Sequence, residues 1–324
     1  MTRPVFVFGT GRSGTHSIAR LMASVPRTIS LHEGEGKGLS GERLELGDLM
    51  GLNVYLYHGA GREEALRESV EVTGDAARLM DAAFARRHAL LQQVAKEDTH
   101  FCDANRCAYN YIDYIRHHYP DARFVHLVRN GYNCARSWNY RIGAYPSAGE
   151  LARHKVRSTF RRYFGDGRGD GIAEHLCDLR ARVLLARRTL SDRSICILSA
   201  MGSRNYHLEK PVPFAGDEVR DRWGSFRRMQ KLAWFWAWTN DQISERFSRI
   251  PDDQRMVLRI EDLDEAATRR LLEFLGLPEE FDRALLKPHG VAPKSTGFSW
   301  SQEDRDDFNG LAGDCMERFG YELQ

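Results

Sequence analysis

The sequence is poor in lysine and contains no long apolar run. Its longest apolar stretch is far shorter than the roughly 18 residues that a membrane-spanning helix needs, so we expect no membrane span. A strand-like segment begins at Pro4, too early for the apolar region of a signal peptide. These absences predict a cytoplasmic protein.

Metal-binding patterns are also missing. The six cysteines form no CxxC pair, and the chain has no HExxH segment and no tight cluster of histidine and cysteine. His117 and His118 are adjacent, but neighbouring helical residues point about 100° apart, which favours two solvated side chains over a ligand pair. We therefore expect neither a metal site nor a disulfide framework.

Charge of one sign does not dominate the chain. Its 324 residues include 47 basic and 45 acidic side chains, a net charge of +2, which is too small for a general nucleic-acid binder. Only 7 of the basic residues are lysine and 40 are arginine. This excess reflects either a coding bias toward arginine or the use of guanidinium groups to bind phosphate oxygens through two N–H groups. An apolar content of 42% is typical of a globular chain with a sizeable core.

Short apolar strands alternate with helical patterns along most of the chain. Strand candidates are residues 4–8, 28–31, 100–103, 123–128 and 256–260. Helical spacing recurs at residues 76–95, 109–118, 132–142, 180–190, 226–247 and 266–275. The alternation predicts an α/β fold with a P-loop-type parallel sheet flanked by helices on both faces. Between residues 143 and 222 the strand signal fades, and we interpret this segment as a largely helical insertion in a single domain, 1–324.

A glycine-rich turn joins the first predicted strand to the first predicted helix. Residues 9–15 read GTGRSGT, and apolar residues then recur at helical spacing. Such a turn points several backbone N–H groups at one spot, where the helix dipole adds partial positive charge. The glycines allow close approach of a ligand, and Arg12 with the hydroxyls of Ser13 and Thr15 adds donors. The segment therefore predicts an anion site.

The turn departs from the nucleoside-triphosphatase pattern G-x-x-x-x-G-K-[ST]. After Gly14 the chain continues with Thr15 and His16, so both the lysine and the magnesium-binding hydroxyl of that pattern are missing from their positions. Phosphoryl transfer from ATP or GTP relies on both groups. We therefore expect this turn to bind its anion without a metal.

A second cationic segment follows the strand at 123–128. Arg129 ends that strand, and Ser137 and Arg141, one turn apart, lie on the polar face of the helix that follows. Open α/β sheets bind ligands at the carboxyl ends of their strands. We therefore expect Arg129, Ser137 and Arg141 to converge on a phosphate; an arginine-rich amphipathic surface helix is the alternative.

Together these segments resemble the sulfotransferase superfamily, whose members move a sulfuryl group from 3′-phosphoadenosine 5′-phosphosulfate (PAPS) to an acceptor. Residues 6–15 resemble the 5′-phosphosulfate loop in the form found in bacterial and tyrosylprotein sulfotransferases, and residues 124–137 resemble the 3′-phosphate motif. The resemblance extends from residue 4 to about 321 and is weakest within 143–222.

The resemblance implies PAPS as donor, 3′,5′-ADP as product and no required metal. The residues that it implies for donor binding are Gly11, Arg12, Ser13, Gly14, Thr15, His16, Arg129, Ser137 and Arg141. Arg12 stands where many relatives have a lysine, and its catalytic contribution should be electrostatic because a guanidinium keeps its proton near neutral pH. The acceptor would be a hydroxyl of a small molecule, lipid or carbohydrate. The sequence identifies neither that acceptor nor the oligomeric state.

The acceptor hydroxyl must lose a proton during attack, so a general base is expected beside it. Glu33 is our choice, because it follows the second predicted strand and lies 21 residues after Arg12. Tyrosylprotein sulfotransferases place their base glutamate at the same interval. His32 and Glu35 remain alternatives for this role.

One segment departs from the family pattern. Where tyrosylprotein sulfotransferases carry a lysine, residues 103–106 read Asp-Ala-Asn-Arg, so Asn105 or Arg106 would have to substitute. This departure puts a peptide tyrosine acceptor in doubt. We expect the insertion at 143–222 to shape the acceptor pocket, because loops of this kind vary function on a fold. An atypical P-loop kinase and a non-catalytic nucleotide-binding module are the alternative functions.

Overall fold

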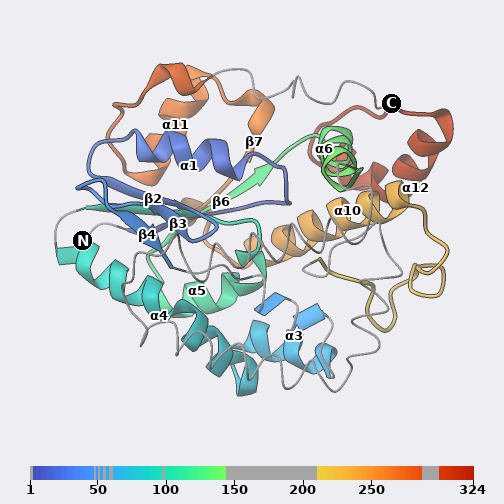
Figure 1. Cartoon of the computed structure of the whole chain (residues 1–324), viewed down its shortest axis with the longest axis horizontal. Coiled ribbons are helices and arrows are strands. Elements are labelled where there is room, and N and C mark those ends of the chain that lie inside the picture. Colours follow the sequence, from blue (N-terminus) through green and yellow to red (C-terminus); the bar gives the residue numbers. More distant parts are fainter. Residues whose placement is uncertain are drawn as a thin grey trace.

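A mixed β-sheet organises the chain. The computed structural model describes residues 3–46, 49, 52–53, 56–57, 61–96, 99–143, 210–286 and 299–324. In these ranges the sheet has seven strands in the order β4-β3-β2-β5-β1-β6-β7 (Figure 1). They are β1 (Val5–Phe8), β2 (Thr28–His32), β3 (Glu35–Lys37), β4 (Arg43–Glu45), β5 (His100–Ala104), β6 (Arg123–Val128) and β7 (Arg255–Arg259). Strands β2, β5, β1, β6 and β7 pair in parallel. Strands β3 and β4 extend the sheet beyond β2 in antiparallel pairing.

Helices cover both faces of this sheet. They are α1 (Thr15–Ala23), α3 (Arg62–Glu71), α4 (Gly74–Lys96), α5 (Ile112–His118), α6 (Gly131–Gly143), α10 (Arg228–Phe247), α11 (Glu265–Leu275) and α12 (Gln302–Arg318). Figure 1 shows α1 and α11 above the sheet and α4 and α5 below it. The alternation within β1 explains this layering, because Val5 and Val7 pack with α1 and α11 while Phe6 and Phe8 pack into the opposite core. A strand buried on both faces reads as a continuous apolar run.

The predicted fold class is confirmed, with additions at the edge of the sheet. Strands β3 and β4 were not predicted, because each is three residues long and mostly charged, as protected edge strands often are. Helices α3 and α12 were also not predicted, because their apolar residues are few. The predicted helix at 180–190 lies outside the described residues, as do residues 144–209 of the predicted insertion at 143–222. None of the helices described is long and apolar enough to span a bilayer.

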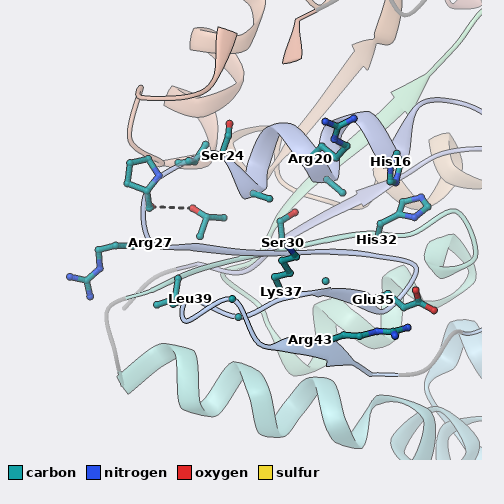
Figure 2. Close-up of a pocket in the computed structure, with 18 residues that line it drawn as sticks. His16, Arg20, Ser24, Arg27, Ser30, His32, Glu35, Lys37, Leu39 and Arg43 are labelled. Carbon is teal, nitrogen blue, oxygen red and sulfur yellow. Dashed lines mark hydrogen bonds between the residues drawn. The ribbon is translucent and has the colours of Figure 1, made fainter. Parts of the chain in front are cut away.

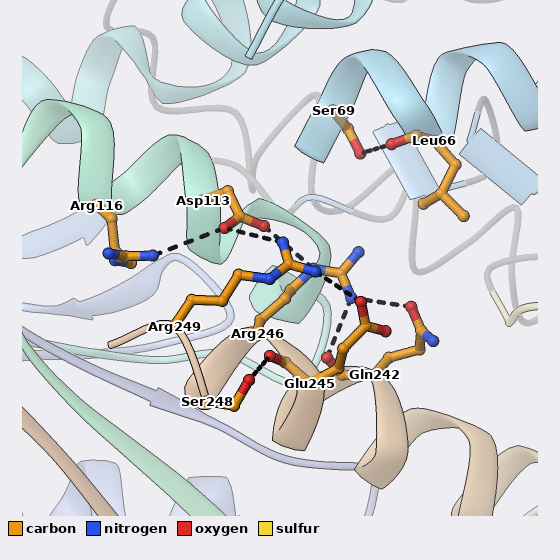
Figure 3. A network of polar contacts seen from close by, with 9 residues as sticks. All are labelled: Leu66, Ser69, Asp113, Arg116, Gln242, Glu245, Arg246, Ser248 and Arg249. Atoms are coloured by element: carbon orange, nitrogen blue, oxygen red, sulfur yellow. Dashed lines mark hydrogen bonds and ion pairs between the residues drawn. The ribbon is translucent and has the colours of Figure 1, made fainter. Parts of the chain in front are cut away.

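A charged cluster joins α10 to α5. The carboxylate of Asp113 lies among three arginines, with N···O separations of 3.5 Å to Arg246, 3.8 Å to Arg249 and 3.9 Å to Arg116 (Figure 3). Burial raises the pKa of Asp113, and the three guanidinium groups oppose that shift. The cluster anchors the end of α10, the helix that carries Trp236 toward the end of β6.

A second ion pair, between Arg87 of α4 and Asp103 of β5, is almost entirely buried. Arg87 Nε donates to Asp103 Oδ2 at 2.8 Å, and the two side chains are 1% and 3% exposed. Breaking a buried pair is costly because the remaining charge has no partner. This pair fixes the carboxyl end of β5, next to the strands that carry the candidate site.

We expect Arg87→Met to lower the free energy of unfolding by about 3–5 kcal/mol, because it leaves the Asp103 carboxylate buried without its guanidinium. Urea unfolding measures the change. The double variant Arg87→Met/Asp103→Leu should recover most of the loss, and Arg67→Met, at an exposed pair, should have a much smaller effect. A double variant as unstable as the single one would contradict this account.

Candidate functional site

The predicted anion loop forms the turn between β1 and α1. Gly14 precedes α1 with φ 105°, and no side chain caps that end of the helix. Arg12, which is exposed, also has a positive φ, 74°. The first N–H groups of a helix have no acceptor within the helix, and their partial positive charge suits an anion. The turn therefore has the geometry that its sequence predicts.

The two cationic segments predicted from the sequence meet in the structure. Arg12 Nε donates to Ser137 Oγ at 2.8 Å, although 125 residues separate them. Arg129 Nη1 donates to the carbonyl oxygen of Arg12 at 3.0 Å. The indole Nε1 of Trp138 donates to the carbonyl oxygen of Gly11 at 2.9 Å. Three hydrogen bonds thus join the glycine loop to the β6–α6 segment.

Distant parts of the chain hold the β6–α6 turn in place. The carbonyl oxygen of Arg129 accepts from Trp236 Nε1 at 3.0 Å, and the amide of Asn130 donates to Glu261 Oε1 at 3.0 Å. The other carboxylate oxygen of Glu261 accepts from the hydroxyl of Tyr321 at 2.8 Å. Helix α10 therefore supports Arg129 directly, and the segment after β7, itself bonded to Tyr321, supports the next residue, Asn130.

Glu33 lies at the tip of the hairpin formed by β2 and β3. His32 pairs with Glu35 across this hairpin, so Glu33 and Gly34 form a two-residue turn. Their φ angles are 54° and 82°. Such turns need a positive φ at both positions and favour asparagine, aspartate or glycine at the first. Turn geometry alone therefore does not explain a glutamate at position 33.

Arg106, rather than Asn105, faces the candidate base. Arg106 Nε donates to Glu33 Oε1 at 2.6 Å, and the two side chains are 17% and 18% exposed. Asn105 instead accepts from the amide of Cys107 at 2.8 Å and is buried. Of the two residues considered as substitutes for the family lysine, Arg106 is the one that contacts Glu33. A forked guanidinium also orients the carboxylate.

His32 lies between the glycine loop and Glu33. Its Nε2 is 3.3 Å from the Thr15 hydroxyl and 3.8 Å from Glu33 Oε1, and its ring centroid is 4.9 Å from that of His16. Burial lowers the pKa of His32 below its ordinary value of 6.5, although Glu33 opposes this shift. The imidazole is therefore mainly neutral near neutral pH and can accept a proton.

The remaining predicted residues divide into three groups. Ser13 and Thr15 are buried in the loop, and Ser13 Oγ has no hydrogen-bond partner among the described residues. Glu35 is exposed on β3. Arg141 belongs to α6, but its side chain lies outside the described part of the structure. Within the described ranges, no group of three His, Cys, Asp or Glu side chains is arranged to hold a metal ion.

Trp138 and Lys210 emerge only from the structure as neighbours of the loop. Lys210 is 2% exposed, and its Nζ lies 3.4 Å from a ring centroid of Trp138. The guanidinium of Arg106 lies 5.9 Å from the Trp138 ring. The helical pattern predicted at 132–142 includes Trp138 without distinguishing it, and no local sequence signal distinguishes Lys210. Both contacts are set by packing between segments that are distant in sequence.

Residues 4–164, about half of the chain, match the model of the sulfotransferase family. This range contains the glycine loop, Glu33, Arg106 and the β6–α6 segment. The chain belongs to the sulfotransferase superfamily. Membership supports sulfuryl transfer as its general activity. No curated protein matches the sequence significantly.

Three solved structures resemble the chain over its full length. The sulfotransferase domain from the curacin biosynthetic pathway is 13% identical, with a TM-score of 0.41 and 99% of its own chain covered. The sulfotransferase from Alicyclobacillus acidocaldarius is 13% identical, with a TM-score of 0.42 and 98% coverage. The sulfotransferase domain from the Synechococcus PCC 7002 olefin synthase is 14% identical, with a TM-score of 0.41 and 98% coverage.

Gly11→Ala should destabilise the protein, because a Cβ at this position would overlap Cζ2 of Trp138. We expect a loss of about 1–3 kcal/mol in the free energy of unfolding, measured in urea. Gly224→Ala is the matched control, since a Cβ there meets nothing within 4 Å. Equal stability of the two variants would show that Trp138 does not constrain the loop.

Proposed function

We propose that the chain is a PAPS-dependent sulfotransferase that moves a sulfuryl group to a hydroxyl of a small molecule, lipid or carbohydrate. The observation that carries the proposal is the contact between the two cationic segments. Arg12 reaches Ser137, and Arg129 reaches the backbone of Arg12. A donor with a phosphosulfate at one end and a 3′-phosphate at the other needs two such cationic groups within the span of one nucleotide.

The residues of the loop fit a phosphosulfate. Gly11 is buried and a Cβ there would overlap Trp138, so the glycine lets the loop pack directly against that indole. Ser13 Oγ is buried without a hydrogen-bond partner among the described residues, and a buried hydroxyl of this kind requires an acceptor. Arg12 is exposed and can supply charge-assisted hydrogen bonds.

The reaction forms a bond between the acceptor oxygen and sulfur and breaks the bond between sulfur and the bridging oxygen of the donor. Glu33 accepts the proton that the acceptor hydroxyl loses, and Arg106 orients the Glu33 carboxylate. Arg12 and the first amides of α1 stabilise negative charge at the transferring group and at the departing phosphate. Arg129 and Ser137 hold the 3′-phosphate.

Calorimetry with 3′,5′-ADP and with ATP tests the donor assignment. We expect 3′,5′-ADP to bind without magnesium. We also expect Ser137→Ala to weaken its binding roughly tenfold, while binding of 5′-ADP, which lacks the 3′-phosphate, changes much less. Ser248→Ala removes a serine hydroxyl at the end of α10 and serves as the matched control.

Two outcomes contradict the donor assignment. Binding of ATP only, and only with magnesium, would favour the atypical kinase. Equal losses for 3′,5′-ADP and 5′-ADP in Ser137→Ala would remove Ser137 from the 3′-phosphate site.

Glu33→Gln should lower turnover by roughly 10²- to 10⁴-fold with little change in the affinity for 3′,5′-ADP, because it removes the base and leaves the loop intact. Turnover is measured with the acceptor found in a screen for radiolabelled sulfate transfer across alcohols, phenols, glycans and lipids. Glu42→Gln makes the same change at an exposed position of the neighbouring β3–β4 hairpin and is the control.

The same turnover assay shows whether Glu33, His32 or Glu35 acts as the general base. Full activity in Glu33→Gln would exclude Glu33 as the base. A large loss in His32→Gln or Glu35→Gln, with Glu33→Gln unaffected, would assign the role to that residue instead.

A further inference from the structure

A groove of about 870 Å³ runs between α1 and the hairpins formed by β2, β3 and β4 (Figure 2). One wall is the α1 face that bears His16, Ala19 and Arg20, and the other walls come from the strands. Figure 2 shows His16 and His32 at one end and Arg27 at the other. The volume falls within the range of about 300–1,000 Å³ that is usual for small-molecule sites.

Positive charge lines this groove. The cations that border it are Arg20, Arg27, Lys37 and Arg43, and the imidazoles of His16 and His32 lie at one end. Glu35 is the one acidic residue among the described residues that line it. Among the described residues, Arg20 and Lys37 are exposed and form no ion pair. A chain with a net charge of +2 has thus concentrated cations along one groove.

The strand pairing brings two of these cations together. Lys37 of β3 is directly opposite Arg43 of β4, and Ser30 of β2 is directly opposite Lys37. Like charges at directly opposed positions destabilise a sheet. Arg43 is partly compensated by an ion pair with Glu45, whereas Lys37 is not. An anion in the groove would relieve this repulsion.

Strand β2 forms the floor of the groove. Thr28, Ser30 and His32 alternate with Ile29 and Leu31 along β2, so the polar residues face the groove while the apolar ones enter the core. Glycines 36 and 38 also line it. The hydroxyls of Thr28 and Ser30 suit the hydroxyl groups of a sugar. The floor extends about 13 Å from Thr28 to His32.

The end of the groove lies beside the candidate base. His32, which lines the groove, has its Nε2 3.8 Å from Glu33 Oε1. His16, at the same end, is in the first turn of α1, directly after the glycine loop. A ligand that fills the groove therefore ends next to the groups proposed to activate an acceptor hydroxyl.

Other anionic partners fit the groove less well. An acidic lipid surface needs apolar contact, and among the described residues that line the groove only Leu39 is large, apolar and strongly exposed. An acidic peptide would add to the free edge of the sheet at β4, whereas the groove lies over the sheet face. Apart from two imidazoles, the lining found in the described part of the chain has no aromatic ring for the stacking of nucleic-acid bases.

We infer that this groove binds an acidic oligosaccharide and presents one of its hydroxyls to Glu33. Carboxylate or sulfate groups of the sugar contact Arg20 and Lys37, and its hydroxyls contact the floor formed by β2. The binding itself follows from the groove, whereas its role as the acceptor subsite rests on the proposed function.

Calorimetry with trigalacturonate, a trisaccharide with three carboxylates, tests this inference on the full-length protein. We expect it to bind, to bind more weakly as salt increases, and to bind about tenfold more weakly to the double variant Arg20→Gln/Lys37→Gln. Neutral maltotriose should bind at least tenfold more weakly than trigalacturonate. Arg270→Gln, at an exposed arginine of α11 outside the groove, is the matched control.

Several results would overturn the inference. They are absence of trigalacturonate binding, equal binding by the double variant, equal loss in Arg270→Gln, or tighter binding of hexaglutamate or of anionic vesicles. A titration of the wild-type protein with 3′,5′-ADP separates the two proposals. If trigalacturonate binds through Arg20 and Lys37 but 3′,5′-ADP does not bind, the donor assignment fails and the groove stands. The reverse pattern rejects the groove alone.

Discussion

The contact between the glycine loop and α6 is the constraint on which the candidate site depends. Arg12 and Arg129 carry like charges, yet they are held together by hydrogen bonds to a hydroxyl and to a backbone carbonyl. Trp138 adds a third bond to the loop, at Gly11. The acceptors of these three hydrogen bonds are uncharged, so the bonds do not neutralise the charge of either guanidinium group. The bonds bring the guanidinium groups of Arg12 and Arg129 to the turn that precedes α1.

The order of the strands arranges the remaining groups around this contact. In the parallel part of the sheet, β2, β5, β1 and β6 follow one another, and each ends at the same edge. Glu33 follows β2, Arg106 follows β5, Arg12 follows β1 and Arg129 follows β6. These four groups therefore lie side by side along one edge of the sheet, in the order Glu33, Arg106, Arg12 and Arg129. Ligands of open α/β sheets bind at this edge.

The sequence was sufficient for the elements whose residues repeat a strong local pattern. The β1 run, the glycines after it and the periodicity of α6 are all local, and each was predicted close to its observed bounds. The contact between Arg106 and Glu33 was not predictable in this way, because it requires β2 and β5 to be neighbours. The three-residue strands β3 and β4 lack a readable alternation, so the groove that they border was also missed.

The register of β2 determines which of its side chains enter the hydrophobic core and which face the groove and the candidate site. Ile29 and Leu31 are buried in the core on one face, which turns Ser30 and His32 to the other. A slip of one residue would reverse both faces and place an imidazole and a hydroxyl in that core. The same register brings His32 to Thr15 and ends the strand where Glu33 begins the turn. Apolar burial of two side chains therefore positions the candidate base and the floor of the groove together.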